Sequence, residues 1–130
     1  MEARVDDGSV LYPLGKDAIG YLVYSADGYM SGLIMRADRA RFSSENPTTV
    51  SVEEKAAAAD SCVGYCGRYD VSEGSVVHHT EVSTVPNWVG VDQKRSLHLE
   101  GDTLTLSEPW PFTQGGKRVI SHVTWVRAQG

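Results

Sequence analysis

A tight turn at Asp27-Gly28, between two runs of aromatic and β-branched residues, constrains this chain more than any other feature. The run before the turn is Tyr21-Leu22-Val23-Tyr24, and the run after it extends from Tyr29 to Met35. An Asp-Gly pair placed between two such runs is a strong short-range signal for an antiparallel hairpin. The sequence therefore predicts strands at 21–24 and 29–35.

Short strand-like runs and tight turns recur along the rest of the chain. Further strands are predicted at 2–5, 68–71, 76–84, 91–100, 103–107 and 119–127. In the pair at 91–100 and 103–107, leucines alternate with polar residues across a turn at Gly101-Asp102, which indicates one buried face and one solvated face. We expect about eight antiparallel strands.

One helix interrupts the strands. Ser51-Val52-Glu53-Glu54 has the form of a capping box, in which the serine accepts from the amide three residues on and the glutamate reaches back. Strong helix formers follow from Lys55 to Asp60. We predict a helix from about 52 to about 63, ending before Gly64, and expect it to act as a lid or plug.

The expected fold is all-β and forms a single domain over residues 1–130. About eight up-and-down strands close into a barrel whose interior is filled by side chains or holds one small ligand. Closure also removes exposed sheet edges. An open sandwich is the structural alternative.

Charge and cysteine content restrict the partners and the compartment. The net charge is −5, and the lysines and arginines are scattered, so we expect no nucleic-acid partner. The first residues contain no apolar signal-peptide core and no run is long enough to span a membrane. Cys62 and Cys66 lack other metal-ligating neighbours, which favours two reduced thiols in a cytoplasmic protein.

Several segments together resemble the bacterial and fungal lipocalin-like domain family. They are, in chain order, Pro13-Leu14-Gly15 with Gly20-Tyr21-Leu22-Val23-Tyr24, Asp27-Gly28-Tyr29-Met30-Ser31, Tyr65-Cys66-Gly67-Arg68-Tyr69, Val77-His78-His79, Pro86-Asn87-Trp88-Val89-Gly90, Leu99-Glu100-Gly101-Asp102 with Leu104-Thr105-Leu106, and Trp125-Val126-Arg127. The resemblance implies a lipocalin-type barrel and, for some relatives, a place in natural-product pathways. It does not imply one activity.

The sequence departs from this family at its first strand, which looks shortened. Family members normally begin with a Gly-x-Trp strand, whose tryptophan packs under an arginine of the last strand. Arg127 matches that arginine, but no tryptophan precedes Trp88. Trp125, Trp110 or a neighbouring subunit covers the gap, or the barrel closes imperfectly. A homodimer that completes the missing edge would be physically sensible.

His78 is the first candidate for chemistry. Adjacent strand residues point to opposite faces, and Val76, His78, Thr80 and Val82 form the more apolar set, so His78 is expected inside and His79 outside. An inward histidine can act as a general acid or base, with Tyr69 as a second catalytic candidate. The alternative is a lining histidine hydrogen-bonded to a tyrosine. We expect no metal site, because the remaining histidines lack ligand spacing.

Aromatic residues supply the candidate ligand contacts. Tyr24 and Tyr69 are the preferred pocket residues, with His78 and Trp125 beside them; aromatics that only fill the core are the alternative. Asn87 and Trp88 lie in a loop that forms either the barrel rim or a simple turn. Arg95 shares strand parity with Leu97, and an inward arginine requires a carboxylate or an anionic ligand.

Three functions remain open. The chain binds a small hydrophobic molecule in the lumen, within a secondary-metabolite pathway; or it is a cofactor-free cyclase, isomerase or dehydratase acting on a polyketide-like substrate; or it is a solidly packed barrel with a structural role. Phosphate-loop, dinucleotide and nucleophile-elbow motifs are absent, so no cofactor is expected. A second polar group beside His78 in the lumen would favour catalysis.

Overall fold

The computed structural model describes residues 1–108, 112–114 and 116–129, and of residues 112–114 the backbone only. The elements are β1 (Glu2–Val5), β2 (Val10–Leu11), β3 (Ile19–Tyr24), β4 (Tyr29–Met35), α1 (Val52–Asp60), β5 (Cys62–Ser72), β6 (Ser75–Ser83), the 3₁₀ turn η1 (Pro86–Trp88), β7 (Asp92–Glu100), β8 (Thr103–Ser107), β9 (Phe112–Gln114) and β10 (Lys117–Val126). The chain is therefore mostly β, as predicted.

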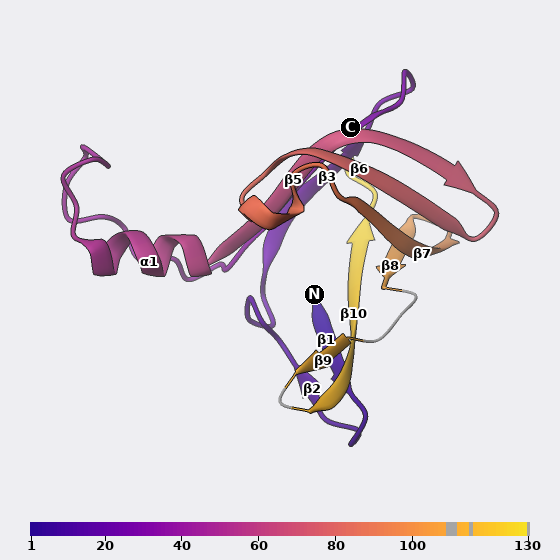
Figure 1. Cartoon of the computed structure of the whole chain (residues 1–130), viewed down its shortest axis with the longest axis horizontal. Coiled ribbons are helices and arrows are strands. Elements are labelled where there is room, and N and C mark those ends of the chain that lie inside the picture. The colour runs from indigo at the N-terminus through magenta and orange to yellow at the C-terminus, as the bar shows by residue number, and fades with distance from the viewer. Residues whose placement is uncertain (109–111, 115, 130) are drawn as a thin grey trace.

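The strands form one antiparallel sheet of ten strands. Its order is β2-β1-β10-β8-β7-β6-β5-β4-β3, with β9 paired to β10 off this path. From β3 to β8 each strand lies beside the next one in sequence, which is the predicted up-and-down order. The sheet curves strongly, so that β5 and β6 arch over the end of β10 (Figure 1).

The sheet is consistent with a lipocalin-like barrel, but it is not closed. Strands β2 and β3 are its two ends, and within the described residues no ladder joins them. The sheet also has ten strands instead of about eight, because the two-residue β2 and the three-residue β9 add short pairs. Such short runs carry too few residues to show an alternation in sequence.

The hairpin of β3 and β4 forms as predicted. Tyr21 pairs with Leu33 and Tyr24 pairs with Met30. The turn is closed by the Ser25 amide, which donates to the Tyr29 carbonyl over 2.8 Å. Gly28 adopts a φ of 97°, a conformation that side chains with a Cβ rarely take, so glycine is required at this point of the turn.

The helix begins as predicted and ends earlier. Ser51 and Glu54 form the capping box, but α1 stops at Asp60 and not near residue 63. Cys62 and Val63 belong instead to β5, where they pair with Met35 and Ile34. The ladder to β4 outweighs the local helix preference of this segment. Figure 1 shows α1 projecting to one side of the sheet, so the expected lid or plug is not what the helix forms.

Strand β5 also begins six residues before the predicted start at Arg68, and it contains an irregular register with β6. Cys66 pairs with Val82 whereas Gly67 pairs with Thr80, so Glu81 is an extra residue on β6. A Cβ added to Gly67 would lie 1.8 Å from the His79 carbonyl oxygen. Only glycine allows the two backbones to approach this closely, and such bulges increase the local twist of a sheet.

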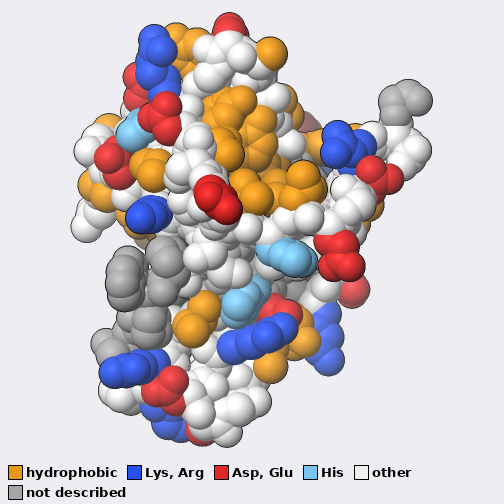
Figure 2. Space-filling model, turned by 90° about the vertical axis from the view of Figure 1, so that its right-hand side faces the viewer, with side chains coloured by type: hydrophobic (Ala, Val, Ile, Leu, Met, Phe, Trp, Pro, Cys, Tyr) orange, Lys and Arg blue, Asp and Glu red, His pale blue; other side chains and the backbone are white. Residues whose placement is uncertain are grey.

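The interior face of β6 is the best-buried part of the chain. Val76, His78 and Thr80 alternate along it with exposed fractions of 0 %, 1 % and 2 %. By contrast, alternate residues of the end strand β3 are open to solvent, and Tyr21 is 77 % exposed. Figure 2 shows hydrophobic side chains gathered at the surface on one face of the molecule.

Among the described residues, no helix has the length and apolarity needed to cross a membrane.

Candidate functional site

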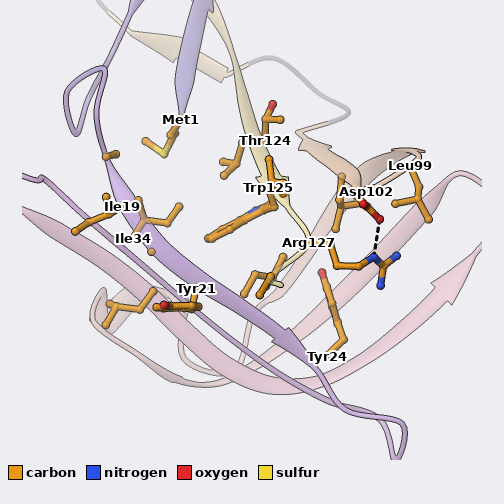
Figure 3. A pocket seen from close by; sticks show the side chains of 18 of the residues that line it. Met1, Ile19, Tyr21, Tyr24, Ile34, Leu99, Asp102, Thr124, Trp125 and Arg127 are labelled. Carbon is orange, nitrogen blue, oxygen red and sulfur yellow. Dashed lines mark hydrogen bonds and ion pairs between the residues drawn. The ribbon is translucent and has the colours of Figure 1, made fainter. Parts of the chain in front are cut away.

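A cavity of about 1340 Å³ lies between the end strand β3 and the last strand β10. Its walls are mostly apolar and come from several strands. Among the residues that line it are Leu22, Tyr24, Ile34, Tyr69, Val76, Leu97, Leu104, Val123 and Trp125. In Figure 3, Trp125 and Tyr24 project toward the same space from opposite sides. Within the part of the chain that the structure describes, no residue of α1 lines this cavity.

His78 lies directly behind the cavity wall, between two tyrosines. Its Nε2 is 2.6 Å from the Tyr24 hydroxyl, and its Nδ1 is 2.6 Å from the Tyr65 hydroxyl. The three side chains come from β6, β3 and β5, which the curvature of the sheet brings together. Both ring nitrogens are thus hydrogen-bonded, as a buried imidazole requires.

Burial keeps this trio uncharged. Removal from water lowers the pKa of His78 to about 4, and the positive charge of Arg95 acts in the same direction. Burial likewise raises the pKa of the Tyr24 hydroxyl and that of Tyr65. At neutral pH the imidazole is therefore neutral, so one of its nitrogens donates a hydrogen bond and the other accepts one.

Tyr69 lines the cavity, as expected for a pocket residue, but it does not partner His78. The two residues are direct cross-strand neighbours. The Tyr69 hydroxyl nevertheless donates to the Ser25 carbonyl over 2.7 Å, and its ring packs edge-on against Tyr24 with centroids 4.8 Å apart. Tyr69 therefore fixes the ring of Tyr24 and the turn that follows it.

Tyr65 is the functional candidate that sequence reasoning missed. The predicted strand begins at Arg68 and so excludes it; a strand extended to Cys62 places Tyr65 four residues from Tyr69 and on the same side. Parity alone does not show that its hydroxyl, rather than that of Tyr69, reaches the imidazole.

Asn87 and Trp88 lie away from the cavity. They belong to η1, a single 3₁₀ turn, where Asn87 is exposed. The Trp88 ring packs edge-on against Tyr65, with centroids 6.0 Å apart. Neither residue is among the described ones that line the cavity. Trp88 thus packs against the buried trio at Tyr65, and the simple-turn alternative describes this loop.

Arg95 faces the interior, as its parity predicts, beside Val76 on the next strand. Its guanidinium donates to the Gln93 side-chain carbonyl over 3.1 Å and lies 3.5 Å from a carboxylate oxygen of Glu108. The carboxylate supplies the partner that a largely buried arginine needs. Arg95 does not line the cavity within the described residues, so it acts on the site through its charge.

Trp125 and Arg127 lie on the far wall of the cavity, on and just after β10. The Arg127 Nε donates to a carboxylate oxygen of Asp102 over 3.0 Å, and its backbone amide donates to the Asp102 carbonyl over 2.8 Å. Asp102 is therefore the partner of Arg127. From the sequence, an aromatic side chain is expected to cover this arginine. Trp110, another proposed cover, lies outside the described residues.

His79 faces outward and is held between two carboxylates. Its ring nitrogens lie 2.7 Å from Asp92 and 2.7 Å from Asp70. These hydrogen bonds, the one to Asp92 first, raise the pKa of His79. Across the described ranges, no three or more His, Cys, Asp or Glu side chains are arranged to hold a metal ion.

Comparison with known proteins agrees with the fold. Residues 1–128 match the model of a family described as a lipocalin-like domain. The chain is 33 % identical over 104 residues to the 4'-hydroxy-3'-methoxypropiophenone carrier protein ppsC of Aspergillus oryzae, a match covering 74 % of this chain and 94 % of that protein. No solved structure matches the chain. The chain belongs to the lipocalin-like domain family.

Proposed function

We propose that this protein binds and carries a small, uncharged, largely apolar molecule of secondary metabolism in the cavity between β3 and β10. The observation that carries the proposal is the cavity itself, which has a volume of about 1340 Å³ and mostly aliphatic and aromatic walls. Sites for small molecules commonly combine such walls with a few polar groups that fix orientation. A barrel packed solid would leave no such volume.

Charge in the cavity also supports a neutral ligand. Of the described side chains that line it, those of Asp102 and Arg127 carry charge, and they pair with each other over 3.0 Å. A charged ligand would lose its hydration on entry without gaining an unpaired counter-charge from this pair, and burial of an unpaired charge is costly.

The carrier of Aspergillus oryzae supports an aromatic ketone as the first ligand to test. Its name states that it carries a hydroxy-methoxypropiophenone, which is a phenyl ketone. A substituted phenyl ketone is small compared with the cavity volume of about 1340 Å³. We therefore place the ligand of this chain among small aryl compounds of that size or larger.

The enzymatic alternative is a cofactor-free isomerase or cyclase that moves protons through Tyr24, His78 and Tyr65. The hydrogen-bonded trio is the observation that favours it. However, a general base works best with a pKa near the working pH, and burial lowers the pKa of His78 to about 4. Burial also raises the pKa of both tyrosines, which makes them weaker acids. The carrier is therefore the better-supported function.

Titration with 4'-hydroxy-3'-methoxypropiophenone tests both functions in one sample. Carriage predicts saturable quenching of tryptophan fluorescence, with a smaller signal in Trp125→Phe and the wild-type signal change in Trp88→Phe, which lies outside the cavity. Chromatography of the released ligand should recover it unchanged. Conversion of the ligand would establish the enzymatic alternative. Absence of saturable binding to the wild type, checked by calorimetry, would overturn the proposal.

The two cysteines support action in a reducing compartment, for which we propose the cytoplasm. Both are free, and both lie on β5. Four residues along an extended strand separate their Cα atoms by roughly 13 Å. A disulfide spans at most about 7 Å between Cα atoms, so these cysteines cannot bridge each other in this fold.

A further inference from the structure

We infer that the Tyr24 hydroxyl is the hydrogen-bonding anchor for the ligand, and that His78 and Tyr65 behind it allow this hydroxyl either to donate or to accept. The inference rests on the proposed function and specifies its ligand class. The ligand is a neutral aromatic molecule whose polar group is a ketone or a hydroxyl.

The position of Tyr24 singles it out among the hydroxyl groups around the cavity. Tyr69 also lines the cavity, but its hydroxyl donates to the Ser25 carbonyl. Tyr21 also lines the cavity, but it is 77 % exposed, so a ligand bond to its hydroxyl would compete with water. Tyr24 projects from the end of β3 toward the space that Trp125 also faces (Figure 3). Its ring is held edge-on by Tyr69, so the hydroxyl is presented in one orientation.

The neutral imidazole of His78 makes the anchor adjustable. In one tautomer Nε2–H donates to the Tyr24 oxygen, Tyr65 donates to Nδ1, and the Tyr24 hydrogen is available to a ligand carbonyl. In the other tautomer Tyr24 donates to Nε2, Nδ1–H donates to the Tyr65 oxygen, and a lone pair of Tyr24 is available to a ligand O–H. Both arrangements keep both ring nitrogens paired. The exchange moves hydrogens within the trio without creating a charge.

A trio that merely filled the core would be satisfied by either tautomer and would show no response to a ligand. Because Tyr24 lines the cavity, the two tautomers are no longer equivalent when a ligand is bound. A ligand carbonyl requires the hydroxyl hydrogen of Tyr24, whereas a ligand hydroxyl requires a lone pair of the Tyr24 oxygen. A ketone therefore selects the Nε2–H tautomer. A carboxylate should bind poorly, because Asp102 already pairs with the Arg127 side chain on the cavity wall.

Four naphthalene probes test the anchor. They are 2-acetylnaphthalene, 2-naphthol, 2-ethylnaphthalene and 2-naphthoate, with affinities measured by calorimetry. The wild type should bind the ketone and the naphthol about three- to tenfold more tightly than the ethyl compound, as one buried hydrogen bond provides. The naphthoate should bind more weakly than the ketone. Tyr24→Phe should lose the preference for the ketone and the naphthol and retain the affinity for 2-ethylnaphthalene.

Tyr29→Phe is the matched control, because Tyr29 lies on the neighbouring strand, outside the described cavity lining, and its hydroxyl accepts from Arg68. It should keep the wild-type preferences. Equal binding of the ketone and the ethyl compound by the wild type, or an unchanged preference in Tyr24→Phe, would overturn the anchor and leave the carrier function standing. Failure of all four probes to bind the wild type would overturn both.

Nitrogen NMR of histidine-labelled wild-type protein tests the tautomer without a substitution. Addition of 2-acetylnaphthalene should shift the His78 signals toward the Nε2–H form, whereas 2-ethylnaphthalene should not. The readout is independent of how well Tyr24→Phe folds. An unchanged tautomer on saturation with the ketone would contradict the adjustable anchor.

Discussion

Tyr65 and His78 meet on the inner face of the sheet, where the Tyr65 hydroxyl lies 2.6 Å from Nδ1 of the imidazole. They are not cross-strand partners, because Tyr65 pairs with Ser83 and His78 pairs with Tyr69. A bulge lies between these two pairs, at Gly67 and Glu81, and such irregularities increase the local twist of the strands. Tyr65, and not the cross-strand neighbour Tyr69, is therefore the tyrosine of β5 that supports the imidazole.

Tyr65→Phe should destabilise the protein by about 1–3 kcal/mol. The substitution removes the hydroxyl and leaves one nitrogen of a buried imidazole without a partner, which costs about that much. Urea denaturation at pH 7.5 measures the loss. Tyr29→Phe, whose hydroxyl is at the exposed surface, should change stability by less than about 0.5 kcal/mol. Equal losses in the two variants would contradict the role of the trio in the core.

Stability should fall as the pH is lowered from about 6.5 to about 4. His78 has its pKa lowered from 6.5 to about 4 in the folded chain, so the unfolded chain binds the additional proton over this interval. The groups around it are Tyr24, Tyr65, Arg95 and His79. The contribution of His78 is complete above pH 6.5 and decreases by about 3 kcal/mol on the way to pH 4. Denaturant unfolding at several pH values checks this, and His78→Gln should show a shallower dependence.

His79 should have the opposite dependence on pH. Its carboxylate partners Asp92 and Asp70 raise its pKa, so the stabilisation is complete below the unfolded value of 6.5 and is lost as pH rises through the folded value. His79→Gln should therefore be more destabilising at pH 6 than at pH 9. Melting temperatures at the two pH values provide the comparison. A loss that is equal at both pH values would contradict a charged His79.

Gly67→Ala should be among the most damaging small substitutions in the sheet. Its Cβ would lie 1.8 Å from the His79 carbonyl oxygen, so β5 and β6 would have to separate beside the trio. We expect a loss at or above the upper end of about 1–3 kcal/mol. Gly74→Ala is the control, since it has a φ of 72° and nothing within 4 Å, and should cost about 1 kcal/mol. Urea unfolding that ranks Gly74→Ala as the worse variant would contradict this account.

Ser51→Ala should weaken α1 without affecting ligand binding. Ser51 accepts from the Glu54 amide, and removing such a cap costs about 1 kcal/mol. The helix contributes no described residue to the cavity, so affinity for 2-acetylnaphthalene should stay within about twofold of the wild type. Circular dichroism and calorimetry measure the two effects. A large loss of affinity would restore the helix as a lid.

The sequence by itself determined the elements that depend on local chemistry. The Asp27-Gly28 turn, the capping box at Ser51 and the alternation of leucines along β7 and β8 each involve neighbours in sequence, and all three occur in the structure. Strand alternation likewise placed His78 inside and His79 outside, because side chains of adjacent strand residues point to opposite faces.

Only the tertiary structure decided where these elements end and which side chains meet. The helix stops at Asp60 because Cys62 and Val63 complete a ladder with β4, a partner that is distant in sequence. Tyr24 and His78 are 54 positions apart, and their contact depends on the curvature accumulated over four strands. Sequence patterns record the face on which a side chain lies. Whether two hydroxyls come within 2.6 Å of one imidazole depends on the twist of the whole sheet. The residue pattern of a single segment does not determine that twist.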